Sequence, residues 1–190
     1  MKHQSIENSP IATFLFSNTK ISWVWLVIRI YVGWQWLSAG LEKVHSTAWV
    51  GANAGSAITG FVNGAIAKTG GAHPDVQGWY ASFLQHSVLT HPVAWAHMVA
   101  WGEVFVGIAL LAGILTGIAA FFGLFMNLNY LLAGTVSTNP ILFTLAIGII
   151  LAWRIAGYIG GDYFLLPLLG TPWHRGALFK KSAPPESQTS

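Results

Sequence analysis

Six polar side chains stand inside otherwise apolar stretches of this sequence. They are Arg29, Gln35, Glu103, Asn127, Asn129 and Arg154. A guanidinium stays protonated at ordinary pH and holds sulfur oxyanions, phosphates or carboxylates through a bidentate fork of hydrogen bonds. A buried carboxylate can exchange a proton. These residue types together predict a site that handles an anion and a proton.

Glu103 is the side chain that most needs a partner. It lies between Val93 and Leu115, where His97 is the only other conventionally polar residue. A carboxylate that faced hydrocarbon at that depth would cost several kcal/mol, so it must be neutral, paired or hydrated.

Three other polar groups are predicted to lie at a depth in the membrane similar to that of Glu103. With a rise of about 1.5 Å per residue, Arg154, Arg29 and Asn127 lie roughly 10, 12 and 14 Å from the inner ends of their segments, and Glu103 lies roughly 18 Å from its own. We therefore expect Arg29, Arg154, Glu103 and Asn127 to form one buried cluster, slightly on the cytoplasmic side of the midplane.

The charges of this predicted cluster do not balance. Two guanidiniums meet one carboxylate, so an anion, a polar ligand head or water must complete the site. Gly107, one turn beyond Glu103, leaves room for a ligand ring or permits close helix contact. An ion-pair network that only holds helices together is the alternative interpretation.

Composition places the chain in a membrane. Hydrophobic residues make up 54% of the 190 residues and charged residues only 8%, whereas soluble domains carry about a quarter charged residues. The net charge of +3 is thinly spread, which argues against nucleic-acid binding. The absence of cysteine excludes disulfides, cysteine-ligated iron–sulfur clusters and thiol exchange.

Hydropathy predicts an all-α integral membrane protein, a bundle of four transmembrane helices that forms a single domain over residues 1–190. The predicted spans are about 21–41, 93–115, 118–136 and 141–161, with an outer loop over 42–92 and a cytoplasmic tail over 162–190. Within the outer loop, apolar residues at helical spacing predict two short amphipathic helices that cover the bundle.

The distribution of basic residues predicts orientation. The termini carry Lys2, Lys20, Arg175, Lys180 and Lys181. The long loop carries only Lys43 and Lys68, and the other loops carry none. We therefore expect both termini in the cytoplasm and the chain in the inner membrane of a prokaryote.

The histidines could bind a metal or shuttle protons at the outer rim, but their pattern does not favour a cofactor site. Only His97 lies inside a predicted span, whereas a bis-histidine haem needs two facing histidines. The remaining histidines lack a tight ligand spacing. We expect no haem, no iron–sulfur cluster and no metal.

Three segments resemble the DoxX/DoxD family of membrane proteins. They are RIYVGWQWLSAGLEKV, WGEVFVGIALLAGILTGIAAFFGLFMNLNYLLAG and WRIAGYIGGDYFLLP, and the resemblance covers roughly residues 21–167. The long outer loop, the length and the tryptophan content are most similar to DoxD, the large subunit of thiosulfate:quinone oxidoreductase. The resemblance implies oxidation of thiosulfate to tetrathionate, with membrane quinone as co-substrate and a small DoxA-like subunit as partner.

The family pattern matches this chain by position at five polar residues. They are Arg29, Lys43, Glu103, Asn127 and Arg154. We expect Arg29 and Arg154 to hold the sulfur oxyanion and Glu103 to pass protons to the reduced quinone. Candidates for binding substrate or quinone are Asn127, Asn129, Lys43 and Gly107. The alternative is a non-enzymatic subunit, either a scaffold for a partner or an anion or proton pathway, and a homodimer is left open.

Overall fold

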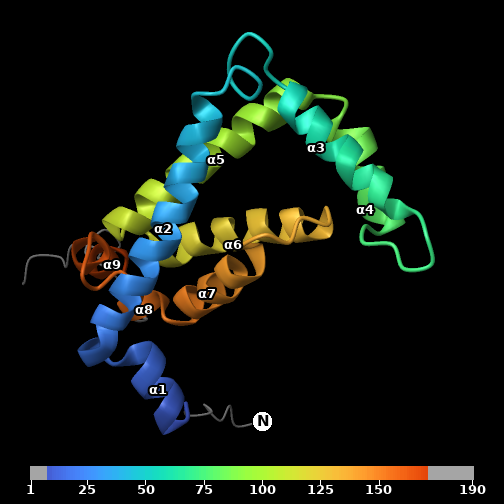
Figure 1. The fold of residues 1–190 in the computed structure, drawn as a ribbon. Coiled ribbons are helices and arrows are strands. Elements are labelled where there is room, and N and C mark those ends of the chain that lie inside the picture. Colours follow the sequence, from blue (N-terminus) through green and yellow to red (C-terminus); the bar gives the residue numbers. More distant parts are fainter. Residues whose placement is uncertain (1–7, 171–190) are drawn as a thin grey trace, which may run out of the picture.

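The computed structural model describes residues 8–170, which fold into helices and contain no strand (Figure 1). Four helices are longer than the others: α2 (Ser22–Val44), α5 (Pro92–Ala112), α6 (Thr116–Leu132) and α7 (Asn139–Leu151). The shorter ones are α1 (Pro10–Ser17), α3 (Ser56–Ile66), α4 (Gly78–Phe83), α8 (Trp153–Ala156) and α9 (Asp162–Leu169). Single turns η1 (Thr19–Ile21), η2 (Ala67–Thr69) and η3 (Leu84–Val88) join them.

Glycines set the register between α2 and α5, which run antiparallel side by side (Figure 1). A Cβ atom on Gly40 would lie 2.6 Å from the backbone nitrogen of Val104, and one on Gly107 would lie 2.5 Å from that of Leu37. Gly33 faces Leu110 in the same way. Because only a residue without a side chain allows this approach, the glycines fix which residues of α2 and α5 stand level.

The four predicted helices are present, but the last two are shorter than expected. α6 ends at Leu132 and α7 at Leu151, whereas the sequence predicts ends near 136 and 161. Only α5 is by itself long and apolar enough to cross a membrane within the described part of the chain. α1 and α2 pass that test together, although the chain bends by 53° between them.

The long loop folds as expected into helices that cover one end of the bundle. α3, α4 and η3 share a core with the start of α5 and the end of α6, to which Val62, Tyr80, Leu84, Ala96 and Ala133 contribute. We call this end of the molecule the outer end, and the end formed by the α5–α6 turn, α8 and α9 the inner end, following the predicted orientation.

Asp162 closes the inner end. Its carboxylate accepts hydrogen bonds from the backbone N–H groups of Leu115 (2.6 Å) and Thr116 (2.9 Å) at the start of α6. Leu115 adopts a left-handed conformation with φ 47°, which is unfavourable for a branched side chain. The carboxylate therefore caps α6 and holds the strained turn. Asp162 also begins α9, a helix inside the predicted tail 162–190, of which 171–190 lies outside the described residues.

Candidate functional site

Glu103 is buried at the centre of a three-residue cluster. Its Oε2 atom lies 2.7 Å from Lys43 Nζ, and its Oε1 atom accepts a 2.5 Å hydrogen bond from the Tyr130 hydroxyl. The Glu103 side chain is 1% exposed and that of Lys43 is 21% exposed. We call Lys43, Glu103 and Tyr130 the outer cluster, because they join the end of α2, the middle of α5 and the end of α6.

Residues of the outer loop cover this cluster. The Trp49 ring lies 5.3 Å from Lys43 Nζ, a cation–π distance. The Phe61 ring of α3 meets the Tyr130 ring edge to face at 6.1 Å between centroids. Lys43 and Tyr130 both remain partly exposed, whereas Glu103 is buried between them.

A second pair of buried polar groups adjoins the outer cluster. Trp36 is 3% and Asn127 is 0% exposed, and neither the indole Nε1 nor either polar atom of the amide has a protein partner. A Cβ on Gly123 would lie 2.9 Å from Trp36 Nε1. Side chains on a helix lean towards its N-terminus, so the amide of Asn127, one turn after Gly123, leans to the same place. We call Trp36 and Asn127 the indole–amide pair.

The indole–amide pair is suited to a small polar ligand. The Trp36 and Tyr130 ring centroids are 6.4 Å apart, so the pair lies next to the outer cluster. A buried polar group without a hydrogen bond costs about 1–3 kcal/mol, and native proteins seldom leave three such atoms together. The indole N–H and the amide offer donors and an acceptor, which match a carbonyl, a hydroxyl or water.

Arg29 does not reach Glu103, so the predicted single cluster is wrong. Its guanidinium is buried at the inner end, where Nη2 donates a 2.8 Å hydrogen bond to the Ile159 carbonyl and the charge is attracted to Asp162. It also lies against Gly113. Gly113 follows Glu103 by ten residues on α5 and its C-cap, a distance of about 15 Å along the helix.

Arg154 lies at the inner end as well. Its guanidinium lies 5.6 Å from the centroid of the Trp153 ring, and Trp153 packs on Gly117 at the start of α6. Tyr130, which contacts Glu103, is 13 residues further along α6, or about 20 Å. Both arginines are therefore separated from the carboxylate.

The depth argument failed because it assumed that the predicted spans end in one plane. The glycine contacts instead place the end of α5 level with Arg29 on α2. Arg29 lies more than one turn after the first residue of α2, so the two helices do not end in the same plane. Lys43, named from the sequence only as a ligand contact, becomes the partner of Glu103. The predicted excess of positive charge is absent from the outer cluster, where one cation meets one carboxylate.

Two further candidates have structural contacts. Leu37 fills the space beside Gly107, so of the two roles expected for this glycine the close helix contact is the one observed, and no room is left there for a ligand ring. The Asn129 amide donates to the Phe125 carbonyl, and its oxygen accepts a 3.1 Å hydrogen bond from the Tyr80 hydroxyl. Burial raises the pKa of Tyr80 to about 12, so its hydroxyl stays a donor that ties α4 to α6.

Sequence reasoning missed Tyr130 and Trp36. Tyr130 follows Asn127 by three residues, which places both on one face of α6. Trp36 follows Arg29 by seven residues, on the buried face of α2. Helical spacing from Asn127 and Arg29 would have indicated both residues. Aromatic residues are common in apolar spans, however, so neither one stands out in the sequence as a candidate site residue.

The polar site lies inside a recognised family segment. The family model described as DoxX matches residues 24–135, more than half of the chain. The chain belongs to the DoxX family. The segment of this DoxX protein that matches contains the outer cluster and the indole–amide pair and stops before Arg154 and Asp162. No curated protein and no solved structure matches the chain significantly.

Membership establishes the class of protein but not its reaction. DoxX proteins are membrane proteins, in agreement with the composition and with the apolar α5. The match does not single out the DoxD subunit among members of the family.

Proposed function

We propose that this DoxX protein is the membrane subunit of a quinone-linked oxidoreductase that oxidises thiosulfate. Two thiosulfate ions would lose one electron each and join through a new S–S bond to give tetrathionate. The two electrons and two protons would convert quinone to quinol. This assignment extends the resemblance to DoxD, and the chemistry of the buried polar residues supports it.

One observation carries the proposal: the buried Glu103 carboxylate, which accepts a 2.5 Å hydrogen bond from the partly buried Tyr130 phenol, lies next to the unpartnered indole–amide pair. Trp36 and Asn127 would donate hydrogen bonds to a ring carbonyl of the quinone. Glu103 and Tyr130 would deliver protons to the ring oxygen as electrons arrive. Both tasks require groups that are held in place and kept from bulk water, and Glu103, Trp36 and Asn127 are buried.

Lys43 takes the place of the arginines in this scheme. While Glu103 is ionised, its charge balances that of Lys43. When Glu103 is protonated, the ammonium is left uncompensated at the partly exposed edge of the cluster, and it would then attract an anion from the outer side. Arrival of the sulfur oxyanion would thus be linked to proton uptake by Glu103.

The proposed topology has four membrane crossings with both termini in the cytoplasm of a prokaryote. The outer cluster would then face the periplasmic side. A DoxA-like subunit or a second copy of this chain would bind as a separate partner.

The test is quinone reduction by purified protein with thiosulfate, sulfite and sulfide as parallel donors. We expect turnover with thiosulfate, and a loss of at least about 100-fold in Glu103→Gln, in the range of a lost general acid. Asn127→Leu should raise KM for quinone more than it lowers kcat. Gly64→Ala, at a position with open space in α3, is the matched control and should keep full activity. Turnover by Glu103→Gln at the wild-type rate would reject the site.

A scaffold subunit without redox activity is the second candidate. It is favoured by the complete pairing of Glu103, whose two oxygens each have a short hydrogen bond. Absence of turnover with every donor, with and without a DoxA-like partner, would support this function over the first.

A further inference from the structure

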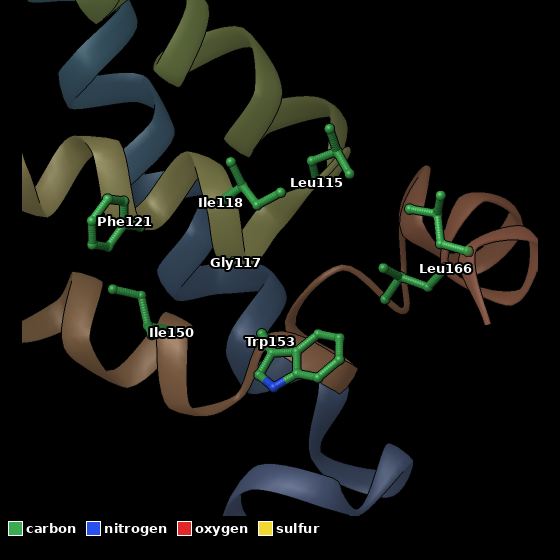
Figure 2. A pocket seen from close by; sticks show the side chains of 8 residues that line it. Leu115, Gly117, Ile118, Phe121, Ile150, Trp153 and Leu166 are labelled. Atoms are coloured by element: carbon green, nitrogen blue, oxygen red, sulfur yellow. The ribbon is translucent and has the colours of Figure 1, made fainter. Parts of the chain in front are cut away.

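An apolar groove of about 380 Å³ opens at the inner end (Figure 2). Ile118 and Phe121 of α6, Ile150 of α7, Trp153 of α8 and Leu166 of α9 line it. The volume lies within the usual range for ligand sites, about 300–1,000 Å³, but among the described lining residues only the Trp153 side chain carries a polar atom. The groove therefore fits a hydrocarbon chain whose polar end is held elsewhere.

A ridge of side chains on α6 leads from the groove to the outer cluster. It consists of Ile118, Phe122, Met126 and Tyr130, which follow one another at intervals of four residues. Residues at that spacing form a continuous row on the surface of a helix. Ile118 lines the groove, and Tyr130 donates its hydrogen bond to Glu103. The ridge thus joins the groove to the proposed quinone site over a length of about 18 Å.

The ridge runs from the lipid-facing surface to the contact between α5 and α6. Ile118 and Phe122 are each more than half exposed, and in a membrane protein such apolar surface faces lipid. Met126 is partly buried against the core. A Cβ atom on Gly102 of α5 would lie 3.5 Å from the Met126 sulfur, so Met126 stands where the two helices meet. An apolar chain on the ridge therefore stays against apolar side chains up to the residue before Asn127.

We propose that the groove holds the isoprenoid tail of the quinone whose ring binds at the indole–amide pair. The tail would leave the ring beside Met126, follow the ridge over Phe122 and enter the groove at Ile118. This path is about 12 Å long, a length that a tail of several isoprene units spans. The inference rests on the proposed quinone site, and it names the substrate class as quinones with a long isoprenoid tail. A phospholipid acyl chain is the competing occupant, and it has no ring to anchor at the indole–amide pair.

Native mass spectrometry of the full chain, without thiosulfate, tests this inference through retained quinone. Two quinones with the same ring are compared, one with a long isoprenoid tail and one without a tail. We expect the wild type to retain the long-tailed quinone at least about tenfold more strongly, a gain that burial of about two methylene groups supplies. Equal retention of the two quinones, or no retention of the long-tailed one, would overturn the inference.

Two leucines of α9 provide a matched pair that tests the groove itself. Leu169 lines the groove, whereas Leu168 is exposed to a similar degree and does not. Leu169→Trp should fill the groove, weaken retention of the long-tailed quinone about tenfold and leave the tailless quinone unchanged. Leu168→Trp should leave both unchanged. Because each quinone partitions into the detergent equally in every sample, the ratio between variant and wild type reports on the protein.

A thermal unfolding curve of each variant separates a lost groove from a lost fold. Ile118→Trp narrows the groove from the side of α6, and it repeats the test if Leu169→Trp does not fold. Unchanged retention of the long-tailed quinone in the folded variant would overturn the inference. So would a loss of bound dioleoyl phosphatidylcholine without a loss of quinone, because that result would assign the groove to an acyl chain.

Two further results separate this inference from the proposed function. Asn127→Leu removes a contact with the ring, so it should weaken retention of both quinones, whereas Leu169→Trp should affect only the long-tailed one. Retention of the long-tailed quinone that depends on Leu169, in a protein that oxidises no thiosulfate, would reject the proposed function and support the tail site.

Discussion

At the scale of single residues, the buried Glu103 carboxylate is stabilised by a cationic side chain long enough to reach it from a neighbouring helix. Glu103 is 1% exposed and would be costly alone. Lys43 reaches it from the last turn of α2 while the ammonium keeps contact with the surface and with Trp49. A lysine whose aliphatic stem lies along apolar surface and whose ammonium stays near water loses less solvation free energy than a fully buried guanidinium.

Removal of Lys43 should therefore destabilise the fold through Glu103. In Lys43→Met the carboxylate loses its only described ion-pair partner, and we expect a loss of about 1–3 kcal/mol, less than for a fully buried pair because Lys43 is partly exposed. For a chain of this size each kcal/mol lowers Tm by about 2–4 °C. Thermal unfolding in detergent, followed by tryptophan fluorescence, measures the shift.

The double variant Lys43→Met with Glu103→Gln checks the cause of that loss. The neutral amide no longer needs an ammonium, so stability should recover most of the difference. A double variant as unstable as Lys43→Met alone would mean that the lysine stem, and not its charge, supplies the stabilisation.

At the scale of helices, close backbone contact determines which polar residues meet. α2 and α5 approach each other at Gly33, Gly40 and Gly107. This contact brings Lys43 within reach of Glu103, and it places Arg29 beside Gly113. A displacement of one turn, about 5.4 Å, would separate Lys43 from the carboxylate. The glycines therefore position the site through the close approach of the two backbones.

Gly107→Ala should push α2 away from α5. A Cβ there would lie 2.5–2.7 Å from Leu37, two of the three contacts being backbone atoms that cannot turn aside. Overpacking of this kind costs about 1–3 kcal/mol, and it should also weaken the Lys43–Glu103 contact. Thermal unfolding and the KM for quinone are the two measurements.

Gly64→Ala is the control for helix propensity. Its added Cβ meets nothing within 4 Å, and alanine favours an α-helix over glycine by about 1 kcal/mol. Stability should therefore stay constant or rise slightly. A Gly107→Ala protein as stable as Gly64→Ala would show that the two helices adjust freely.

At the scale of the whole molecule, α6 and α7 are shorter than the hydrocarbon core of a bilayer is thick. α6 and α7 have 17 and 13 residues, or roughly 25 and 20 Å, against a hydrocarbon core of about 30 Å. α8 follows α7 directly and extends the fourth segment towards the inner end. Short spans of this kind are tolerated by local thinning of the bilayer.

Single cysteines provide a direct test of topology because the chain has none of its own. In intact cells, a membrane-impermeant maleimide should label Asn53→Cys in the outer loop and Ser137→Cys between α6 and α7. It should label Ser9→Cys, before α1, only after the cells are opened. Labelling of Ser9→Cys and Asn53→Cys from the same side would contradict the four-span arrangement.

The sequence by itself determined the class of fold and the identity of most polar residues in the site. Composition and hydropathy predicted helices in a membrane, and the outer-loop periodicity predicted α3 and α4, because burial of apolar faces is a local property of the chain. Glu103 and Asn127 were recognised as candidates because a polar group is conspicuous among apolar neighbours.

The tertiary structure alone decided which of these residues meet. Sequence depth placed Arg29 and Arg154 beside Glu103, whereas the packing of glycines on α5 and α2 brings Lys43 there and leaves both arginines at the inner end. Offsets between helices arise from contacts between segments far apart in the chain, and a shift of a few residues exchanges one partner for another. For that reason the ion pair, the indole–amide pair and the apolar groove at the inner end all became visible only with the helices in place.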